Sequence, residues 1–479
     1  MLHRLTPVWI VAVAVIQAPA VPLHSAWRLP NAASTYTGTA SGLATDAGGA
    51  TITLAKSAAP AAGGGATTAP AFGSVSASLT ADALRGKRVT LRGELETRSA
   101  GGASLWMRVD KASAMLMLDN GGDRAIKGDA TWTPFAVTLP VPPTATSIIV
   151  GVLLRGAGSV TARSVRIETS ATLLADEPIA PDAQKVLDAA VDLVRKNAWM
   201  RDNIDWDVMQ SELRSFAAGA VHTADVYPAI QYLLASLKDR HSFLMPPAAS
   251  RDFDTGGAAN PPISVKDLGD RIGYVNVPRY LGGDPAASRD FATNAHGQLA
   301  MTMDRAGCGW IVDLRNNGGG NMWPMLAGLK PFLGDEPLGT FVSRESTSPP
   351  WKAGQAVGVE PPASLRPLEN AWVAVLTGPR TASSGEAVTI SFKGRPRTRS
   401  FGQPTTGLSS SNGTFRLPDG ATILLTTAIE ADRTGKRYGE KVDPDEIVPS
   451  PTPGATPANP VDDATIAAAT SWLKRSCSK

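Results

Sequence analysis

Residues 310–332 read WIVDLRNNGGGNMWPMLAGLKPF, and this stretch indicates how the C-terminal half of the chain folds. The apolar run at 310–314 predicts a buried strand, the glycines at 318–320 permit a sharp turn, and 322–332 has helical spacing. Free N–H groups at the start of such a helix form a site for negative charge. A plain tight turn is the alternative interpretation. No Gly-Lys-Ser/Thr follows, which argues against a phosphate-binding loop.

Strands and helices alternate on both sides of this stretch, between residues 256 and 450. Such alternation is typical of βαβ units in an α/β domain. The expected strands are 272–277, 310–314, 372–376, 415–417 and 421–427, and the expected helices are 286–304, 322–332 and 384–393. A proline-rich linker with a last helix, from Asp462 to about Trp472, is expected within 451–479.

The N-terminal half predicts two further domains. Residues 173–255 show three amphipathic helical periods and form an expected helical unit. Residues 21–172 contain short strands separated by Gly and Pro turns, which favours an antiparallel β-sandwich similar to a jelly roll. Its clearest expected strands are 89–95, 105–109, 115–118, 135–139, 148–154 and 160–167.

Residues 1–20 are typical of an export signal, with an apolar run at 8–16 and small residues at 18 and 20. The run is too short to span a bilayer, although an uncleaved anchor is the alternative. We therefore expect an exported protein, periplasmic or secreted, with no membrane span after cleavage. Export permits a disulfide between Cys308 and Cys477, and two buried thiols are the alternative. A net charge of +3 argues against nucleic acid as a partner.

A second strand-to-helix turn, TASSGE at 381–386, carries a candidate nucleophile. Ser383 is expected at the mouth of a helix, where main-chain N–H groups can hold an oxyanion. The alternative is a structural capping box, because Ser383 stands three residues before Glu386.

Four motifs in this order resemble the tail-specific (C-terminal-processing) serine peptidases. They are LKDRHS at 237–242, DLRNNGGG at 313–320, TASSGE at 381–386 and YGEKVDPDEIV at 438–448. The resemblance covers roughly residues 175–450 and implies a ClpP/crotonase-like α/β peptidase core at 256–450. It also implies that Ser383 is the nucleophile and that the substrate is a peptide or protein.

The resemblance also distinguishes between two catalytic arrangements. The serine–lysine branch has a lysine where this chain has Leu408, and leucine cannot accept a proton. The branch similar to the tricorn core uses histidine, and His241 matches its Asp-x-His position. His222 and His296 are the competing histidines, but neither lies in a motif.

The remaining site residues are also implied by the resemblance. Ser242 and Glu440 are the nearest matches to a serine and a glutamate that support the histidine, and Asp443 or Asp445 could replace Glu440. The oxyanion is expected on N–H groups of Gly319 and Ser384, with Gly318 as an alternative to Gly319.

Many family members carry a PDZ domain after the histidine segment. Only about 30 residues separate His241 from Arg271, too few for such a domain. The sandwich resembles a galactose-binding-type jelly roll, which implies a recognition module with carbohydrate as a candidate ligand and Trp106 and Trp132 as candidate ligand aromatics. Packing inside the sandwich is the alternative role for these tryptophans.

The sequence therefore predicts an exported serine peptidase that works by a Ser–His acyl-enzyme mechanism. The alternative is a catalytically inactive peptide- or glycan-binding protein on the same core. A crotonase-like acyl-CoA enzyme is a third interpretation, which the export signal disfavours. No cofactor and no metal are expected, because the sequence has no HExxH motif and few histidines.

Overall fold

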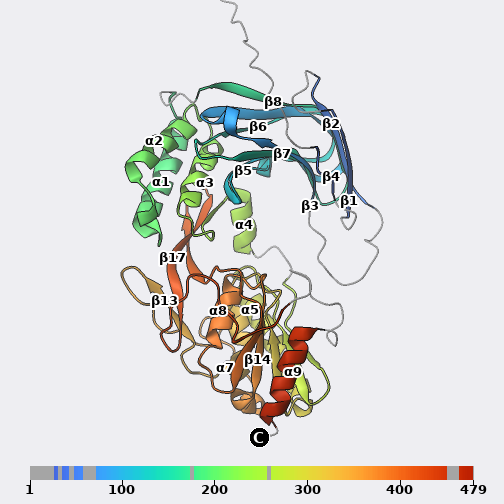
Figure 1. Cartoon of the computed structure of the whole chain (residues 1–479), viewed down its shortest axis with the longest axis vertical. Coiled ribbons are helices and arrows are strands. Elements are labelled where there is room, and N and C mark those ends of the chain that lie inside the picture. The colour runs from blue at the N-terminus through green and yellow to red at the C-terminus, as the bar shows by residue number, and fades with distance from the viewer. Residues whose placement is uncertain are drawn as a thin grey trace, which may run out of the picture. The chain divides into compact units, whose positions relative to one another are not determined.

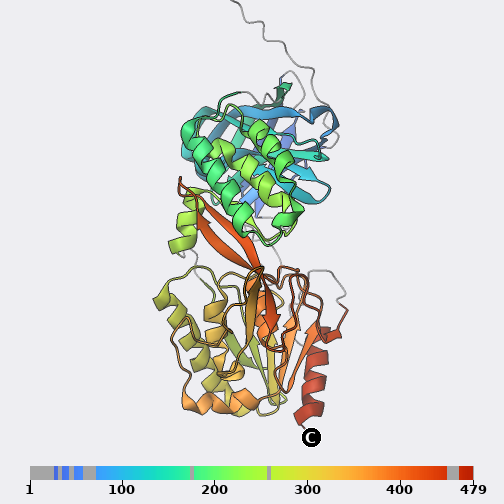
Figure 2. The same cartoon turned by 90° about the vertical axis from the view of Figure 1, so that its left-hand side faces the viewer.

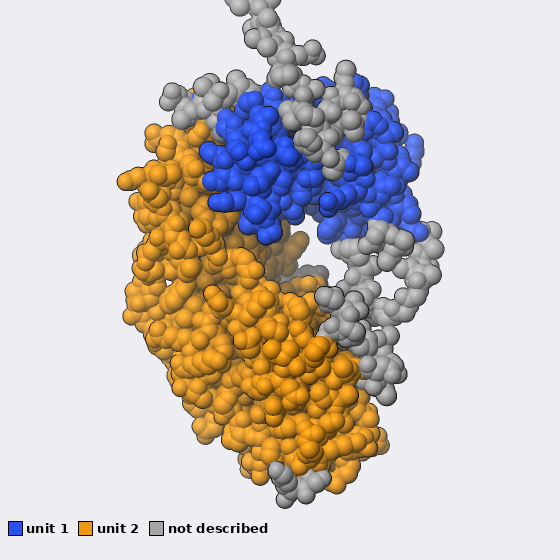
Figure 3. All heavy atoms as spheres, in the orientation of Figure 1, with its two compact units in different colours: residues 1–177 blue, residues 178–479 orange. Residues whose placement is uncertain are grey.

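The computed structural model describes residues 26–30, 35–42, 48–57, 72–172, 177–255, 260–449 and 463–477. The chain divides into two compact units, residues 1–177 and residues 178–479 (Figure 3). The expected export signal and the proline-rich linker lie outside the described residues. Within the described parts of the chain, no helix is both long enough and apolar enough to cross a membrane.

The first unit is β-rich, and its strand pairings are antiparallel (Figure 1). The sheet order is β1-β2-β8-β4-β7-β3, and β5 and β6 also pair with β4. The strands are β1 (Tyr36–Ser41), β2 (Ala50–Lys56), β3 (Phe72–Thr80), β4 (Lys87–Lys111), β5 (Ala114–Asp119), β6 (Ile126–Pro140), β7 (Ser147–Arg155) and β8 (Ser159–Thr172).

Strand β4 corrects the sequence analysis, which expected separate strands at 89–95 and 105–109. One strand runs through both, and register shifts against β6 lie between Leu95 and Ala103. Bulges bend a strand without ending it. The first half of β4 therefore pairs with β6 and β8, and its second half pairs with β5 and β7. The sandwich topology itself stays a prediction.

The second unit joins the expected helical stretch and the α/β core in one compact body. Its helices are α1 (Pro181–Asn197), α2 (Trp206–Ala217), α3 (Tyr227–Ser236), α4 (Pro247–Thr255), α5 (Pro285–Thr302), α6 (Met322–Gly328), α7 (Lys330–Leu333), α8 (Ser384–Ser391) and α9 (Ala464–Cys477). Its strands are β9 (Phe243–Met245), β10 (Ser264–Asp267), β11 (Ile272–Asn276), β12 (Gly309–Asp313), β13 (Gly339–Ser343), β14 (Val373–Thr377), β15 (Thr398–Gly402), β16 (Ser410–Arg416), β17 (Thr422–Asp432) and β18 (Glu446–Ile447).

A six-stranded sheet in the order β10-β11-β12-β14-β15-β18 forms the centre of this unit, and its pairings from β11 to β18 are parallel. Alternate residues of its strands are buried on opposite faces, as in a parallel sheet covered on both sides. On β14, Val373 and Val375 join the cluster that contains residues of α5, α6 and α8, whereas Ala374 and Leu376 pack with α9 (Figure 2).

A second sheet in the same unit is antiparallel. Its order is β13-β17-β16, and the short β9 also pairs with β17. The two sheets supply different parts of the candidate site. The segment between α3 and β9 leads into the antiparallel sheet, to which β16 and β17 also belong, whereas the turn after β14 belongs to the parallel sheet.

The expected single helix at 322–332 is wrong, because it is broken at Leu329 into α6 and α7. Pro331 has no N–H to donate to the carbonyl of Ala327, and its ring would clash with that carbonyl in a continuous helix. The Ala327 carbonyl instead accepts a hydrogen bond from His296 Nε2 at 3.0 Å. The last helix also begins slightly later than expected, since Asp463 Oδ1 accepts from the N–H of Thr465.

Cys308 and Cys477 form a disulfide, with their Cα atoms 5.1 Å apart. The bond ties the end of α9 to the residue preceding β12. Because α9 also covers one face of the six-stranded sheet with Ile466, Ala469 and Leu473, the disulfide reinforces an apolar contact.

We expect the double substitution Cys308→Ser and Cys477→Ser to lower the free energy of unfolding by about 2–4 kcal/mol, because the bond closes a long loop in the unfolded chain. Chemical denaturation of the oxidised protein and of the variant measures this difference. Ser476→Ala, next to the bond, is the control. Equal unfolding midpoints for the oxidised protein and the double variant would contradict a stabilising disulfide.

Candidate active site

The candidate nucleophile turn follows β14 at the carboxyl edge of the parallel sheet. Ser383 stands immediately before α8, with φ +52° and ψ −123°. A residue with a side chain rarely adopts positive φ, so the surrounding contacts must hold this conformation. The serine is partly exposed, so its hydroxyl is accessible from solvent.

Glu386 supplies those contacts from inside the protein. Its carboxylate is 0% exposed and accepts from the N–H of Ser383 at 2.8 Å, as one half of a capping box. The same carboxylate accepts from three groups of the following turn, namely Thr405 Oγ1 and the N–H groups of Gly407 and Leu408. Burial raises the pKa of Glu386, and these four hydrogen bonds counteract the rise.

Leu408 therefore contributes its main-chain N–H where the serine–lysine arrangement has a lysine. The turn it belongs to supports Glu386 and, through Glu386, Ser383. Leu408 has no group that could accept a proton, so a candidate base has to come from another element.

His241 comes from the segment between α3 and β9. Asp239 Oδ1 accepts from the N–H groups of His241 and Ser242 at 3.0 and 2.9 Å, and Asn412 Nδ2 donates to the His241 carbonyl at 2.9 Å. Lys238 at φ +62° and Arg240 at φ +57° complete this tightly turned segment. The segment fixes the main chain on both sides of the imidazole.

The imidazole of His241 joins two serine hydroxyls. Its Nε2 lies 3.0 Å from Ser383 Oγ, and its Nδ1 lies 2.8 Å from Ser410 Oγ. Burial lowers the pKa of His241, and the charge of Asp239 partly opposes this effect. A neutral imidazole whose Nδ1–H donates to Ser410 leaves Nε2 free to accept the Ser383 proton.

Ser410 is the site residue that the sequence analysis missed. It begins β16, opposite Ile429 of β17, and lies 169 residues from His241 in the sequence. The run of three serines at 409–411 was the only local signal, and nothing in it indicates which serine faces an imidazole.

Ser242 and Glu440, the supporting residues expected from the resemblance, lie elsewhere. Ser242 Oγ donates to Asp239 Oδ2 at 2.6 Å and accepts from the N–H of Thr426, so it holds the histidine segment and not the ring. The side chain of Glu440 is exposed, and its carbonyl accepts from Ser409 Oγ.

The alternative acids and histidines are also separate from the ring. Asp445 pairs with Lys393, and Asp443 contributes its carbonyl to the same lysine. The His222 N–H donates to Asp225 in a short turn, and His296 lies in α5. Among the described residues, the hydrogen bonds of the His241 ring are therefore to serines and not to a carboxylate.

The glycine turn after β12 lies against the nucleophile turn. A Cβ on Gly319 would lie 2.8 Å from Ser383 Cβ and 3.1 Å from the Ser384 nitrogen, and Gly319 has φ +97°. Only glycine fits this approach. The Ala382 N–H also donates to the Asn317 carbonyl at 3.0 Å, which joins the two turns directly.

The expected oxyanion donors differ in their availability. The Gly319 N–H already donates to Asn317 Oδ1 at 3.0 Å. Ser384 Oγ donates to the Gly320 carbonyl at 2.5 Å. Within the described residues, no intramolecular hydrogen bond uses the N–H of Gly318 or of Ser384, so these two can bind an incoming oxygen.

A second buried carboxyl lies behind the site. Glu430 of β17 is 2% exposed, and its Oε2 is enclosed without a hydrogen-bond partner. Burial, and after it the charge of Glu386, raise the pKa of Glu430 well above its usual range. Its N–H donates to the Ser409 carbonyl at 3.3 Å, beside Ser410. A neutral carboxylic acid suits this enclosure, because it adds no second negative charge next to Glu386.

The candidate ligand tryptophans of the first unit have partners within that unit. Trp106 Nε1 donates to Ser74 Oγ at 2.9 Å, and the guanidinium of Arg163 stacks on Trp132 at 4.0 Å. Carbohydrate binding is unsupported by these contacts. Within the described residues, no group of three or more His, Cys, Asp or Glu side chains has an arrangement that could hold a metal ion.

Comparison with known proteins gives a consistent family. Residues 271–448 match Peptidase family S41. Over 268 residues the chain is 28% identical to the nisin-resistance protein of Lactococcus lactis, an alignment that covers 54% of this chain and 81% of that protein. It is 26% identical over 182 residues to a carboxyl-terminal-processing protease of a Picosynechococcus species, covering 38% of this chain and 40% of that protein.

A solved structure also resembles this chain in fold. The structure of a lipoprotein from Streptococcus agalactiae superimposes with a TM-score of 0.52 at 23% identity, over 62% of this chain and 98% of that one. The family match and the sequence relatives confirm the resemblance to the tail-specific peptidases.

We expect Glu430→Gln to stabilise the protein at pH 8 and to leave its stability at pH 4 nearly unchanged. The stability contributed by a carboxyl with a raised folded-state pKa is fully present below its unfolded pKa of about 4.3, and is lost as the pH rises through the folded pKa. Glutamine has the same shape and does not ionise.

Thermal unfolding of wild type and variant across this pH range measures the difference, with Glu440→Gln as the exposed control. A Glu430→Gln profile that stays parallel to wild type at every pH would show that the pKa of Glu430 is the same in the folded and unfolded states, and would contradict the raised pKa.

Proposed function

Because residues 271–448 match Peptidase family S41, we propose that the chain hydrolyses peptide bonds with Ser383 as nucleophile and His241 as general base. The observation that carries this proposal is the 3.0 Å contact between His241 Nε2 and Ser383 Oγ. This distance is within hydrogen-bond reach for proton transfer. A histidine base is the arrangement of the tricorn-core-like branch of the family. It does not need the lysine that Leu408 replaces.

The mechanism is acyl transfer in two halves. Ser383 Oγ attacks the carbonyl carbon of the substrate while its proton passes to His241 Nε2, and the carbonyl oxygen becomes an oxyanion. The oxyanion accepts from the N–H groups of Ser384 and Gly318. His241 then gives the proton to the leaving amine, and an acyl-enzyme on Ser383 remains. Water, deprotonated by His241, hydrolyses that ester.

The imidazolium formed in each half is supported without a directly bonded carboxylate. Ser410 Oγ accepts from Nδ1–H, and Asp239 favours the positive charge by its own negative charge. A hydroxyl stabilises an imidazolium less than an ionised group does, since hydrogen bonds with a charged partner are roughly twice as strong as neutral ones. Asp239 therefore has the electrostatic part, and Ser410 the orienting part, of the role that a single acid has in a Ser-His-Asp triad.

Export of the peptidase is part of the proposal. The apolar run at 8–16 has the length of a signal-peptide core. The Cys308–Cys477 disulfide supports the same location, because such bonds persist in oxidising compartments.

A second candidate function is a peptide-binding protein without turnover. The observation in its favour is that the His241 ring bonds to a neutral Ser410 where a triad has a carboxylate. The first experiment below distinguishes the two functions.

Ser383→Ala should abolish labelling by a fluorophosphonate probe and lower peptide hydrolysis on the order of 10⁴-fold or more, as for the removal of a serine nucleophile. His241→Ala should lower hydrolysis to a similar extent, because the hydroxyl then has no base. Ser211→Ala, at an exposed position of α2, is the matched control. Wild type that labels no better than Ser383→Ala would contradict the peptidase and leave the binding protein.

Ser410→Ala should lower kcat/KM roughly 10- to 150-fold, because a lost hydrogen bond to a charged group is worth roughly 1.5–3 kcal/mol. It should also move the acid limb of the pH–rate profile to lower pH, since the imidazolium loses an acceptor. Glu440→Gln should leave both unchanged. A larger loss from Glu440→Gln than from Ser410→Ala would assign the supporting role to the acid instead.

A further inference from the structure

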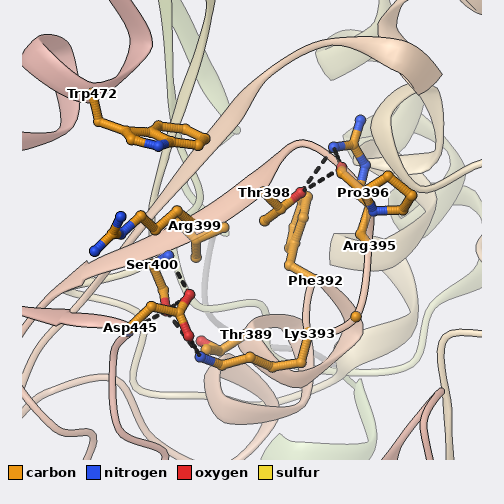
Figure 4. Close-up of a pocket in the computed structure, with 12 residues that line it drawn as sticks. Thr389, Phe392, Lys393, Arg395, Pro396, Thr398, Arg399, Ser400, Asp445 and Trp472 are labelled. Atoms are coloured by element: carbon orange, nitrogen blue, oxygen red, sulfur yellow. Dashed lines mark hydrogen bonds and ion pairs between the residues drawn. The ribbon is translucent and has the colours of Figure 1, made fainter. Parts of the chain in front are cut away.

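A pocket of about 540 Å³ lies in the second unit, between the end of α8, strand β15 and helix α9 (Figure 4). Ser383 precedes the first residue of α8, whereas the pocket contacts that helix through Thr389 and continues along the loop that follows it. None of the residues assigned to proton transfer lines it. A volume of this size is typical of small-molecule sites.

Positive charge in the pocket exceeds negative charge. Lys393 pairs with Asp445 at 2.9 Å, which balances those two groups. Arg395 has no such partner among the described residues, because its hydrogen bonds go to one hydroxyl and to main-chain carbonyls, among them that of Phe332. Burial, and then the charges of Arg433 and Arg397, lower the pKa of Arg395 to about 10. The surroundings of Arg395 therefore favour an added anion.

Arg399 has donors to offer to such an anion. Its Nη1 has no hydrogen-bond partner among the described residues, whereas its Nε is unpaired but enclosed and out of reach of a ligand. Its Nη2 lies 3.2 Å from Glu446 Oε2, but both side chains are more than 40% exposed, and such pairs contribute little. A planar guanidinium that keeps free donors is well suited to bind a carboxylate or a phosphate.

Trp472 supplies an apolar wall. Figure 4 shows its indole on the same side of the pocket residues as the side chain of Arg399. Its ring is held by Trp372 and Phe401, with centroids 5.6 and 5.8 Å away. The wall is therefore preorganised, which reduces the entropy cost of placing a flat ligand on it.

We propose that this pocket binds a small organic anion, whose carboxylate or phosphate group takes the free donors of Arg399 and whose flat apolar part lies against Trp472. The bound anion also balances the charge of Arg395. Because the pocket does not include Ser383 or His241, binding does not depend on the proposed peptidase activity.

Isothermal titration of the full chain with benzoate, phenyl phosphate, inorganic phosphate and benzyl alcohol tests this proposal. Benzoate or phenyl phosphate should bind at least about tenfold more tightly than inorganic phosphate, which lacks the ring, and than benzyl alcohol, which lacks the charge. The stronger of the first two identifies the acidic group that the pocket prefers. Failure of both to bind at millimolar concentration would overturn the proposal.

Variants assign the binding to this pocket. Arg399→Gln should weaken the better ligand about tenfold, and Arg399→Lys should weaken it less, since lysine keeps the charge without the fork. Arg397→Gln removes the same charge two residues away, outside the pocket, and should change affinity by less than about twofold. An equal loss from Arg397→Gln and Arg399→Gln would show unspecific attraction and overturn the site. If Arg399→Gln does not fold, Trp472→Phe tests the position of the ligand by a second route, because it replaces the indole wall with a smaller ring. Unchanged affinity in both Trp472→Phe and Arg399→Lys would also overturn the proposed site.

Discussion

The buried carboxylate of Glu386 holds the candidate site in its conformation. Four donors surround it, from the nucleophile turn on one side and from the turn at 405–408 on the other. Without them a charge with no exposure to solvent would cost several kcal/mol. With them, Ser383 is kept at a positive φ, and the charge of Glu386 adds to burial in raising the pKa of the neighbouring Glu430. The candidate nucleophile turn, which follows β14 of the parallel sheet, is therefore held in one conformation by these hydrogen bonds.

The base comes from the antiparallel sheet, which makes the site a junction between two layers. His241 precedes β9 and Ser410 begins β16, and both strands pair with β17. The hydrogen bond between Ser383 Oγ and His241 Nε2 therefore depends on how the two sheets pack together. In the proposed mechanism a neutral hydroxyl orients the imidazole, and the Asp239 carboxylate, which makes no hydrogen bond to the ring among the described residues, favours its positive charge, so orientation and electrostatics are assigned to different residues.

The sequence predicted the parts of this site that are local. Ser383 could be proposed because its turn is a contiguous motif, and His241 because it matches the Asp-x-His position of the resemblance. Ser410 could not, since its role depends on strand pairing between segments 169 residues apart. The same limit explains β4, whose bulges resemble turns in the sequence, whereas the break at Pro331 was locally readable and was overlooked. The position of Ser410 and the continuity of β4 thus depend on strand pairing between distant segments, which local sequence propensity does not indicate.

In the proposed mechanism His241 is a neutral base whose Nδ1–H donates to Ser410 and whose Nε2 faces Ser383. Nitrogen-15 NMR of histidine-labelled protein tests it directly, because the chain has only five histidines. His296, whose Nε2 bonds to a carbonyl, provides an internal reference for the other tautomer. We expect an Nδ1–H tautomer for His241 with a pKa below its ordinary value of about 6.5. An Nε2–H tautomer, or a pKa raised above that value, would contradict it.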